Sequence, residues 1–274
     1  MKIALTGASG FIGSHIRRHF KNTVVIKRYH TVEDIRKRLS GVDAVINLAG
    51  APIIKRWTES YKDILISSRI RTTKKLVQAI NSSNVRHLIS TSATGIYPDD
   101  VECDESCRNL SQDFLGRLAQ DWEREALRCE KLTTILRFGV VLGKEGGALK
   151  KMLLPFRLGL GGPIGDGSMV MSWIDIHDLM EMYRFVLERG EGGIFNAVSP
   201  NPVTNREFTR ELARVLKRPA ILPVPRLVLR LLYAQSASVL TASKIVYPRR
   251  FLNLGFTFSC PTVEESLRHL LLEG

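Results

Sequence analysis

Cysteine is scarce in this sequence of 274 residues, which has four of them. They are Cys103, Cys107, Cys129 and Cys260. Four scattered cysteines are too few for a disulfide framework, and the Cys103/Cys107 spacing lacks the second cysteine or histidine pair of a zinc motif. We therefore expect reduced thiols and no metal site.

Long apolar runs, internal repeats and low-complexity tracts are missing as well. No run reaches the roughly 20 residues of a membrane-spanning helix. The first expected strand begins at residue 2, which leaves no room there for a signal or transit peptide. These absences predict a soluble, cytoplasmic protein with no membrane partner.

Acidic residues are in the minority, because 40 Lys and Arg against 27 Asp and Glu give a formal net charge of +13. The basic residues are spread along the chain, without interleaved aromatics or a nucleic-acid-binding motif. We expect no nucleic-acid partner and interpret the charge as suited to an anionic cofactor or substrate.

The first thirty residues organise the rest of the chain. Lys2–Thr6 is a short apolar run, three glycines follow at three-residue spacing, and a helical pattern extends from Ile12 to Phe20. This order predicts a strand, a tight turn and a helix whose N-terminal N–H groups bind a pyrophosphate. The expected cofactor-binding residues of the turn are Gly7, Ser9, Gly10, Phe11, Ile12 and Gly13.

The end of the second expected strand, Thr23–Lys27, indicates which dinucleotide binds. A site selective for NAD usually places a carboxylate there, whereas a 2′-phosphate needs cations. This sequence has Lys27 and Arg28, and no carboxylate before Glu33. We therefore predict NADP(H) as the cofactor, the alternative being that both side chains are solvated surface charges.

The third and fourth expected strands also end in candidate site residues. Small residues after the strand Ala44–Leu48 leave room for a flat ring or a ribose, and the expected contacts there are Leu48, Ala49 and Gly50. The strand Arg86–Ser92 ends in a cluster of hydroxyls. Ser92 is a candidate hydrogen-bond partner of a substrate, and capping of the turn is the alternative.

Several of these segments together resemble the extended short-chain dehydrogenase/reductases. The segments on which this resemblance rests are TGASGFIG, NLAG and ISTSATGIY. A narrower resemblance, to nucleoside-diphosphate-sugar-epimerase-like proteins of unknown substrate, rests on NLAGAPI, RWT, SSRIRTT, DFLGRLAQDWE, LRFGVVLG and MSWIDIHDL. It continues from Asn201 into the C-terminal segment typical of that branch. The resemblance also implies that Gly139 and Val140 contact the nicotinamide carboxamide and that the long helices 59–81 and 110–127 form a homodimer.

The catalytic residues depart from the pattern of that superfamily, which has a Ser/Thr and a Tyr-x-x-x-Lys pair. Ser92 matches the hydroxyl, but the helix 110–127 has Asp113 and Arg117 at the best-matching positions of the pair. Asp113 is a candidate proton shuttle, and Arg117 is suited to ribose hydroxyls but not to acid catalysis at neutral pH. Tyr97 is a further candidate acid, with packing at the pocket edge as the alternative.

These observations predict an α/β protein with a Rossmann-type, doubly wound, mostly parallel sheet and a small C-terminal substrate lobe. The expected domains are an NADP-binding Rossmann domain at 1–165, with returning segments at about 172–200, and a small, mainly helical C-terminal lobe at 201–274. The favoured function is an NADP(H)-dependent oxidoreductase acting on an unidentified small molecule. The alternatives are a nucleotide-sugar epimerase and an NADPH-gated regulatory or binding protein without turnover.

Overall fold

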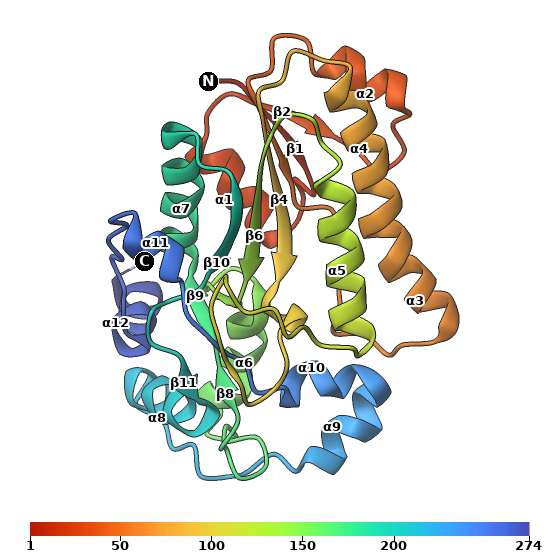
Figure 1. The fold of residues 1–274 in the computed structure, drawn as a ribbon. Coiled ribbons are helices and arrows are strands. Elements are labelled where there is room, and N and C mark those ends of the chain that lie inside the picture. Colours follow the sequence, from red (N-terminus) through yellow and green to blue (C-terminus); the bar gives the residue numbers. More distant parts are fainter. Residues whose placement is uncertain (274) are drawn as a thin grey trace.

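The computed structural model describes residues 1–273 and is built on one central sheet. Its strands are β1 (Ile3–Thr6), β2 (Thr23–Ile26), β3 (Ala44–Asn47), β4 (His87–Ala93), β6 (Leu132–Phe138) and β10 (Gly193–Ala197). They lie in the order β10-β6-β4-β3-β1-β2, and each neighbouring pair is parallel (Figure 1). This confirms the predicted doubly wound sheet.

Helices cover both faces of this sheet. They are α1 (Phe11–His19), α2 (Val32–Arg38), α3 (Glu59–Ile66), α4 (Thr72–Asn81), α5 (Phe114–Ala126), α6 (Gly147–Arg157) and α7 (Ile176–Arg189). Figure 1 shows α1 and α7 on one side of the strands and α4 and α5 on the other. The expected helix 59–81 is continuous but contains a π-helical turn, η1 (Ser67–Arg71), between α3 and α4.

Alternation along β1 explains why the sheet has a core on each face. Ile3 and Leu5 belong to the core that contains Ile16 of α1, whereas Ala4 belongs to the core that contains Leu76 of α4. Successive strand residues point to opposite faces, so a strand covered on both sides must be apolar throughout. All four residues of β1 are buried accordingly.

Most of the remaining elements lie in the C-terminal segment, and apart from α8 they are short. The strands are β5 (Glu102–Cys103), β7 (Val140–Leu142), β8 (Val170–Met171), β9 (Trp173–Asp175), β11 (Val203–Thr204) and β12 (Ile245–Val246). The helices are α8 (Asn205–Leu216), α9 (Arg226–Tyr233), α10 (Ala237–Thr241), α11 (Arg249–Asn253) and α12 (Val263–Arg268). Single turns complete the set: η2 (Thr94–Ile96), η3 (Ala234–Ser236) and η4 (His269–Glu273).

The C-terminal segment is joined to the rest of the chain by two short strand pairs. β11 pairs with β8, and β12 pairs with β5. Figure 1 places α8, α9 and α10 beyond the carboxyl ends of β4 and β6. The segment therefore stands at the edge of the sheet where ligands of such folds bind.

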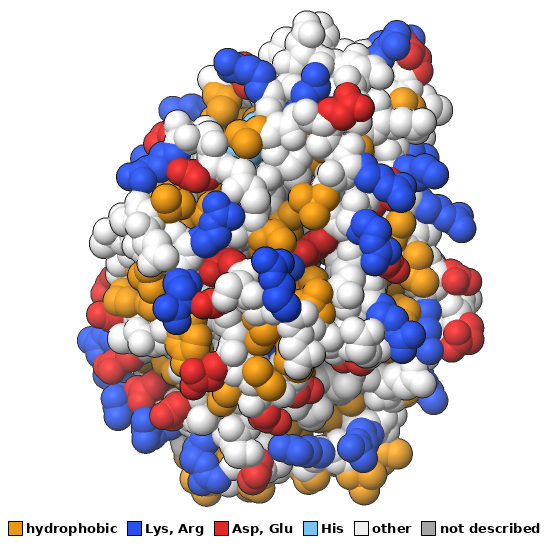
Figure 2. Space-filling model, viewed as in Figure 1, with side chains coloured by type: hydrophobic (Ala, Val, Ile, Leu, Met, Phe, Trp, Pro, Cys, Tyr) orange, Lys and Arg blue, Asp and Glu red, His pale blue; other side chains and the backbone are white. Residues whose placement is uncertain are grey.

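The surface is consistent with the dispersed charge of the sequence. On the face drawn in Figure 2, Lys and Arg side chains are spread widely and alternate with acidic and apolar ones. In the described part of the chain, no helix has both the length and the apolar character needed to cross a membrane.

Candidate functional site

The glycine turn between β1 and α1 has the close contacts that its sequence predicts. Gly7 has a φ of +67°, and a Cβ atom there would lie 2.8 Å from the carbonyl oxygen of Leu48. A Cβ on Gly13 would lie 2.3 Å from the carbonyl oxygen of Gly7. Only glycine has the positive φ and the missing side chain that let α1 approach β1 and β3 so closely.

The N-terminus of α1 is open to an anion. Its N-cap is Gly10, which offers no side-chain hydrogen bond, and the first turn contains no acidic residue. The first N–H groups of a helix have no partner within the helix, so those of Phe11 and Ile12 are available to a phosphate. The loop after β7 closes over this helix start, because Gly143 and Gly146 lie directly against the Phe11 ring.

A cavity of about 620 Å³ lies beside this turn, at the carboxyl ends of β1, β2 and β3. This is where the chain order of the strands reverses, since β1 stands between β2 and β3. Ligands of doubly wound sheets bind at such a position, and the volume suits a small-molecule ligand. The cavity wall includes Gly7 and Ser9 from the turn, and Ala49 and Gly50 from the end of β3.

The walls of the cavity are positively charged. Four cationic side chains line it: Arg17, Lys27, Arg28 and Lys75. Among the described residues, no carboxylate lines it. Lys27 and Arg28 follow β2, as predicted, whereas Arg17 comes from α1 and Lys75 from α4. Cations from three elements favour an anionic group in this cavity.

His30 holds the turn that carries Lys27 and Arg28. Its Nδ1 accepts the backbone N–H of Lys27 at 3.1 Å. Burial, together with the charge of Arg38, lowers the pKa of His30, so the ring stays neutral and keeps this acceptor. The two cationic side chains are thereby presented from a turn with a fixed backbone.

A buried polar network anchors the loop after β3. The Thr6 hydroxyl donates to Asn47 Oδ1 and accepts the N–H groups of Leu48 and Ala49 at 3.0 and 3.1 Å. The Asn47 amide donates to Ser90 and also to Thr73 on α4. These bonds fix the small residues that line the cavity.

Arg69 anchors the other side of this loop. Its guanidinium donates to the Ala51 carbonyl at 3.0 Å and lies 3.0 Å from where a Cβ on Gly50 would be. Burial lowers the pKa of Arg69 to about 10. The Ala51 N–H donates in turn to Ser68, so the π-helical turn η1 holds Ala51 through two neighbouring side chains.

Ser92 lies at the carboxyl end of β4 and is the predicted substrate contact. Its side chain is buried, with 1 % of the residue exposed, yet its Oγ has no hydrogen-bond partner among the described residues. Buried polar groups are nearly always paired, so an unpaired one calls for a reason. A polar group of a bound ligand is such a reason.

Tyr97 is engaged by the protein itself. Its hydroxyl donates to Asn196 at 2.8 Å and accepts from Arg137 at 2.7 Å, while Arg137 forms a bidentate pair with Glu123. Burial raises the pKa of Tyr97 to about 12, although Arg137 opposes the shift. The phenol proton is therefore directed at Asn196, and a role for Tyr97 as the acid stays a prediction.

Asp113 and Arg117 both hold the start of α5. Asp113 is its N-cap and accepts the Gly116 N–H at 2.6 Å, and Arg117 Nε donates to the Gln112 carbonyl at 2.7 Å. Within residues 1–273, no hydrogen bond or ion pair joins either side chain to the other or to Ser92. The structure explains both residues as capping groups, and their catalytic roles stay predictions.

Gly139 and Val140 lie where the chain passes from β6 to β7. The Gly139 N–H donates to the Ala197 carbonyl at 3.3 Å, and the Val140 N–H donates to that of Ser172 at 2.8 Å. A contact of this loop with a carboxamide therefore has to use other atoms of the loop. The predicted contact stays a prediction.

Sequence reasoning missed three contributors to the site: Arg69, the Thr6–Asn47 network and the cations Arg17 and Lys75. The segment SSRIRTT is one of those that carry the family resemblance, but the spacing of its residues does not reveal a π-helical turn. Asn47 is a polar residue at the end of a buried strand, and this signal could have indicated the network, because a buried polar side chain needs hydrogen-bond partners.

Comparison with known proteins gives two family matches. A model described as the NAD dependent epimerase/dehydratase family matches residues 3–197, and a domain of unknown function, DUF1731, matches residues 224–270. The chain is 34% identical to an epimerase family protein of Staphylococcus aureus (strain MRSA252), with 97% of this chain and 98% of the relative covered. It is 33% identical to the chloroplastic SDR39U1 homolog of Arabidopsis thaliana, with 99% and 87% covered.

Two solved structures extend this comparison. The human epimerase family protein SDR39U1 (isoform 2) with NADPH is similar with a TM-score of 0.92 and 32% identity, covering 98% of this chain and 99% of that one. A nucleoside-diphosphate sugar epimerase from Corynebacterium glutamicum has a TM-score of 0.79 and 26% identity, with 99% and 58% covered. Together the matches confirm the resemblance that the sequence motifs indicate, including the C-terminal segment.

Proposed function

The chain belongs to the NAD dependent epimerase/dehydratase family, and from this membership we propose that it is an NADP(H)-dependent oxidoreductase acting on a small carbonyl compound. The observation that carries the proposal is the cavity at the ends of β1, β2 and β3, with its cationic walls. The choice of cofactor rests on this cavity, whereas the chemistry rests on Ser92 of β4, which is not among the residues that line it.

The residues present fit a dinucleotide with a 2′-phosphate. The glycine turn leaves space for a pyrophosphate, and the uncapped start of α1 supplies N–H donors to it. Lys27 and Arg28 stand where a carboxylate would otherwise select a free 2′-hydroxyl. The similar human structure holds NADPH, which supports the same choice here.

Ser92 is the residue best suited to the reacting end. NADPH, when bound, supplies a hydride to a carbonyl carbon. The Ser92 hydroxyl, which has no hydrogen-bond partner within residues 1–273, donates a hydrogen bond to the carbonyl oxygen and stabilises the charge that develops on it. Tyr97, Asp113 and Arg117 already make hydrogen bonds within the protein, which favours Ser92 or water as the source of the proton, with Asp113 as the alternative donor.

An epimerase reaction is the alternative that the family name supports. It first oxidises a sugar hydroxyl, which needs a base, and the usual Tyr-x-x-x-Lys pair is absent because α5 contains neither tyrosine nor lysine. Reduction needs mainly orientation and a proton donor. A third candidate, a regulatory protein that binds NADPH without turnover, is favoured by the same missing pair.

The test is NADPH consumption by the purified protein over a panel of small carbonyl compounds, together with thermal melting in the presence of UDP-sugars. Consumption that yields an equivalent amount of alcohol, and that Ser92→Ala lowers by about 10²- to 10³-fold, supports the reductase. A UDP-sugar that raises the melting temperature and is epimerised supports the alternative enzyme. Tight NADPH binding with no turnover on any compound supports the regulatory protein and contradicts the reductase.

A further inference from the structure

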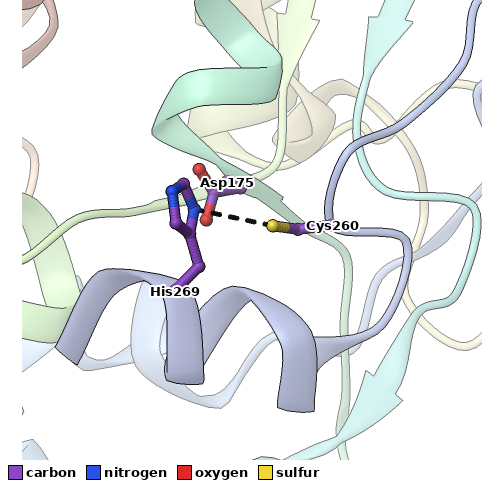
Figure 3. A group of neighbouring side chains, drawn as sticks. All are labelled: Asp175, Cys260 and His269. Atoms are coloured by element: carbon purple, nitrogen blue, oxygen red, sulfur yellow. Dashed lines mark hydrogen bonds between the residues drawn. The ribbon is translucent and has the colours of Figure 1, made fainter. Parts of the chain in front are cut away.

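Three metal-ligating side chains converge where the C-terminal segment packs against the start of α7. Asp175 is the N-cap of α7, Cys260 lies in the loop before α12, and His269 follows α12 (Figure 3). One ligating atom from each lies within 4.8 Å of the other two. The site is separate from the cavity described above, because none of its residues lines that cavity.

The three side chains point toward one another from a buried position. Asp175 is fully buried, and Cys260 is 6 % exposed. The Cys260 sulfur lies 3.6 Å from His269 Nδ1, as the dashed line of Figure 3 marks. This arrangement brings a thiol, an imidazole and a carboxylate together in a space that little solvent reaches.

Neighbouring groups hold the carboxylate in place. Asp175 Oδ2 accepts the Ser266 hydroxyl at 2.6 Å, and Oδ1 accepts the backbone N–H of His177 at 2.7 Å. Each carboxylate oxygen has two acceptor positions. The His177 ring Nδ1, 3.1 Å from Oδ1, occupies the second position of that oxygen, so one position remains on Oδ2 for a metal ion. The His177 ring, whose centroid lies 4.5 Å from that of the His269 ring, is thereby held against the carboxylate.

We propose that Asp175, Cys260 and His269 form a zinc site that joins the C-terminal segment to α7. Sulfur, nitrogen and oxygen ligands together suit zinc better than the other common divalent ions. In a tetrahedral site, Zn–S and Zn–N bonds of about 2.3 and 2.0 Å put the sulfur and nitrogen about 3.5 Å apart. The Cys260–His269 distance of 3.6 Å is close to this value before any rearrangement.

The competing explanation is a hydrogen bond from the Cys260 thiol to His269. The two are distinguished by cobalt(II), which occupies zinc sites and gives a near-ultraviolet charge-transfer band only when a thiolate is a ligand. We expect the full chain, purified metal-free and reduced, to give this band with one equivalent of cobalt and to lose it when zinc is added.

Variants of the cysteines and of His269 test which residues hold the metal ion. Cys260→Ser removes the band, whereas Cys129→Ser, which alters another buried cysteine, leaves it unchanged. His269→Gln weakens zinc binding by at least the roughly 10- to 100-fold that loss of an outer partner of a ligand costs, and it serves if Cys260→Ser does not fold. No charge-transfer band in the parent protein, or a band that persists in Cys260→Ser, overturns the zinc site.

Discussion

At the residue scale, the two serines of β4 separate catalysis from stability. Ser92 Oγ has no hydrogen-bond partner in the part of the chain that the structure describes, whereas Ser90 Oγ accepts a hydrogen bond from the Asn47 amide at 3.1 Å in a buried site. We predict that Ser92→Ala lowers turnover by about 10²- to 10³-fold, as does loss of a hydrogen bond to a developing oxyanion, and leaves the free energy of unfolding unchanged or higher.

Ser90→Ala is the matched control. Because it leaves the Asn47 amide short of a partner, we predict a loss of about 1–3 kcal/mol in the free energy of unfolding. Urea denaturation and turnover, measured on both variants, check the pair. A large loss of stability in Ser92→Ala would mean that its hydroxyl serves the fold instead of a substrate.

His87 makes the stability of the protein depend on pH. Because the Thr134 hydroxyl donates to the Glu191 carbonyl, it must accept from His87 Nε2, at 2.7 Å. Burial lowers the pKa of His87 to about 4 from a usual 6.5. The unfolded state therefore binds more protons between these values, and stability is retained above pH 6.5 and lost as the pH falls towards 4.

We predict that His87→Gln, which retains a donor for Thr134, reduces this acid loss by about 2–3 kcal/mol. The measurement is the free energy of unfolding of both proteins at several pH values across this window. Parallel curves for the two proteins would show that His87 titrates normally in the folded state.

At the scale of elements, the contact between α1 and β1 depends on the absence of a side chain at one position. A Cβ on Gly13 meets two backbone atoms, at 2.3 Å from Gly7 O and 2.8 Å from Ala8 Cα, and neither can rotate away. We predict that Gly13→Ala costs about 1–3 kcal/mol of stability and weakens NADPH binding, because the glycine turn must move.

Gly95→Ala is the control, since a Cβ there meets nothing within 4 Å. We expect this second change to alter stability by less than about 1 kcal/mol. Thermal melting and cofactor titration of the two variants decide the matter. Equal behaviour would show that the turn tolerates a side chain at Gly13.

A buried ion pair ties α5 to β6. Arg137 and Glu123 are 5 % and 7 % exposed and lie 2.7 Å apart. We predict that Glu123→Ala costs about 3–5 kcal/mol, because it leaves the arginine buried without its counter-ion. Asp121→Ala on the same helix breaks an exposed pair with Arg124 and should cost less than about 1 kcal/mol. Denaturation of both variants tests this, and similar small losses would contradict it.

At the scale of the whole molecule, the doubly wound sheet was predictable because its signals are local and strong. Strands such as β1 are short apolar runs. The turn after β1 requires glycines at a fixed spacing, a pattern that few other structures need. The position of the cavity follows from strand order, so Gly7, Gly50, Lys27 and Arg28 could be placed beside it from sequence.

The other features could not be predicted, because they depend on tertiary contacts that the spacing of residues in the sequence does not reveal. Strands of two residues, such as β5 and β12, have no periodicity to detect. The π-helical turn that brings Arg69 to Gly50 has an ordinary helical sequence. That Asp113 caps α5 could not be read from its position alone, because Asp is common at helix N-caps and in catalytic sites alike; its catalytic role stays a prediction.

The most direct test of the account is a pair of titrations, NADPH and NADH against the cofactor-free protein, repeated with Arg28→Ala and with Arg36→Ala. Arg36 is paired with Glu33 and does not line the cavity, so it is the control. We predict that the parent protein prefers NADPH and that Arg28→Ala weakens NADPH binding about 10- to 100-fold, the loss expected for a charge-assisted hydrogen bond. NADH binding should be unchanged in both variants. Equal affinity of the parent protein for the two cofactors, or an Arg28→Ala variant that keeps its preference, would contradict the 2′-phosphate site and with it the proposed use of NADPH.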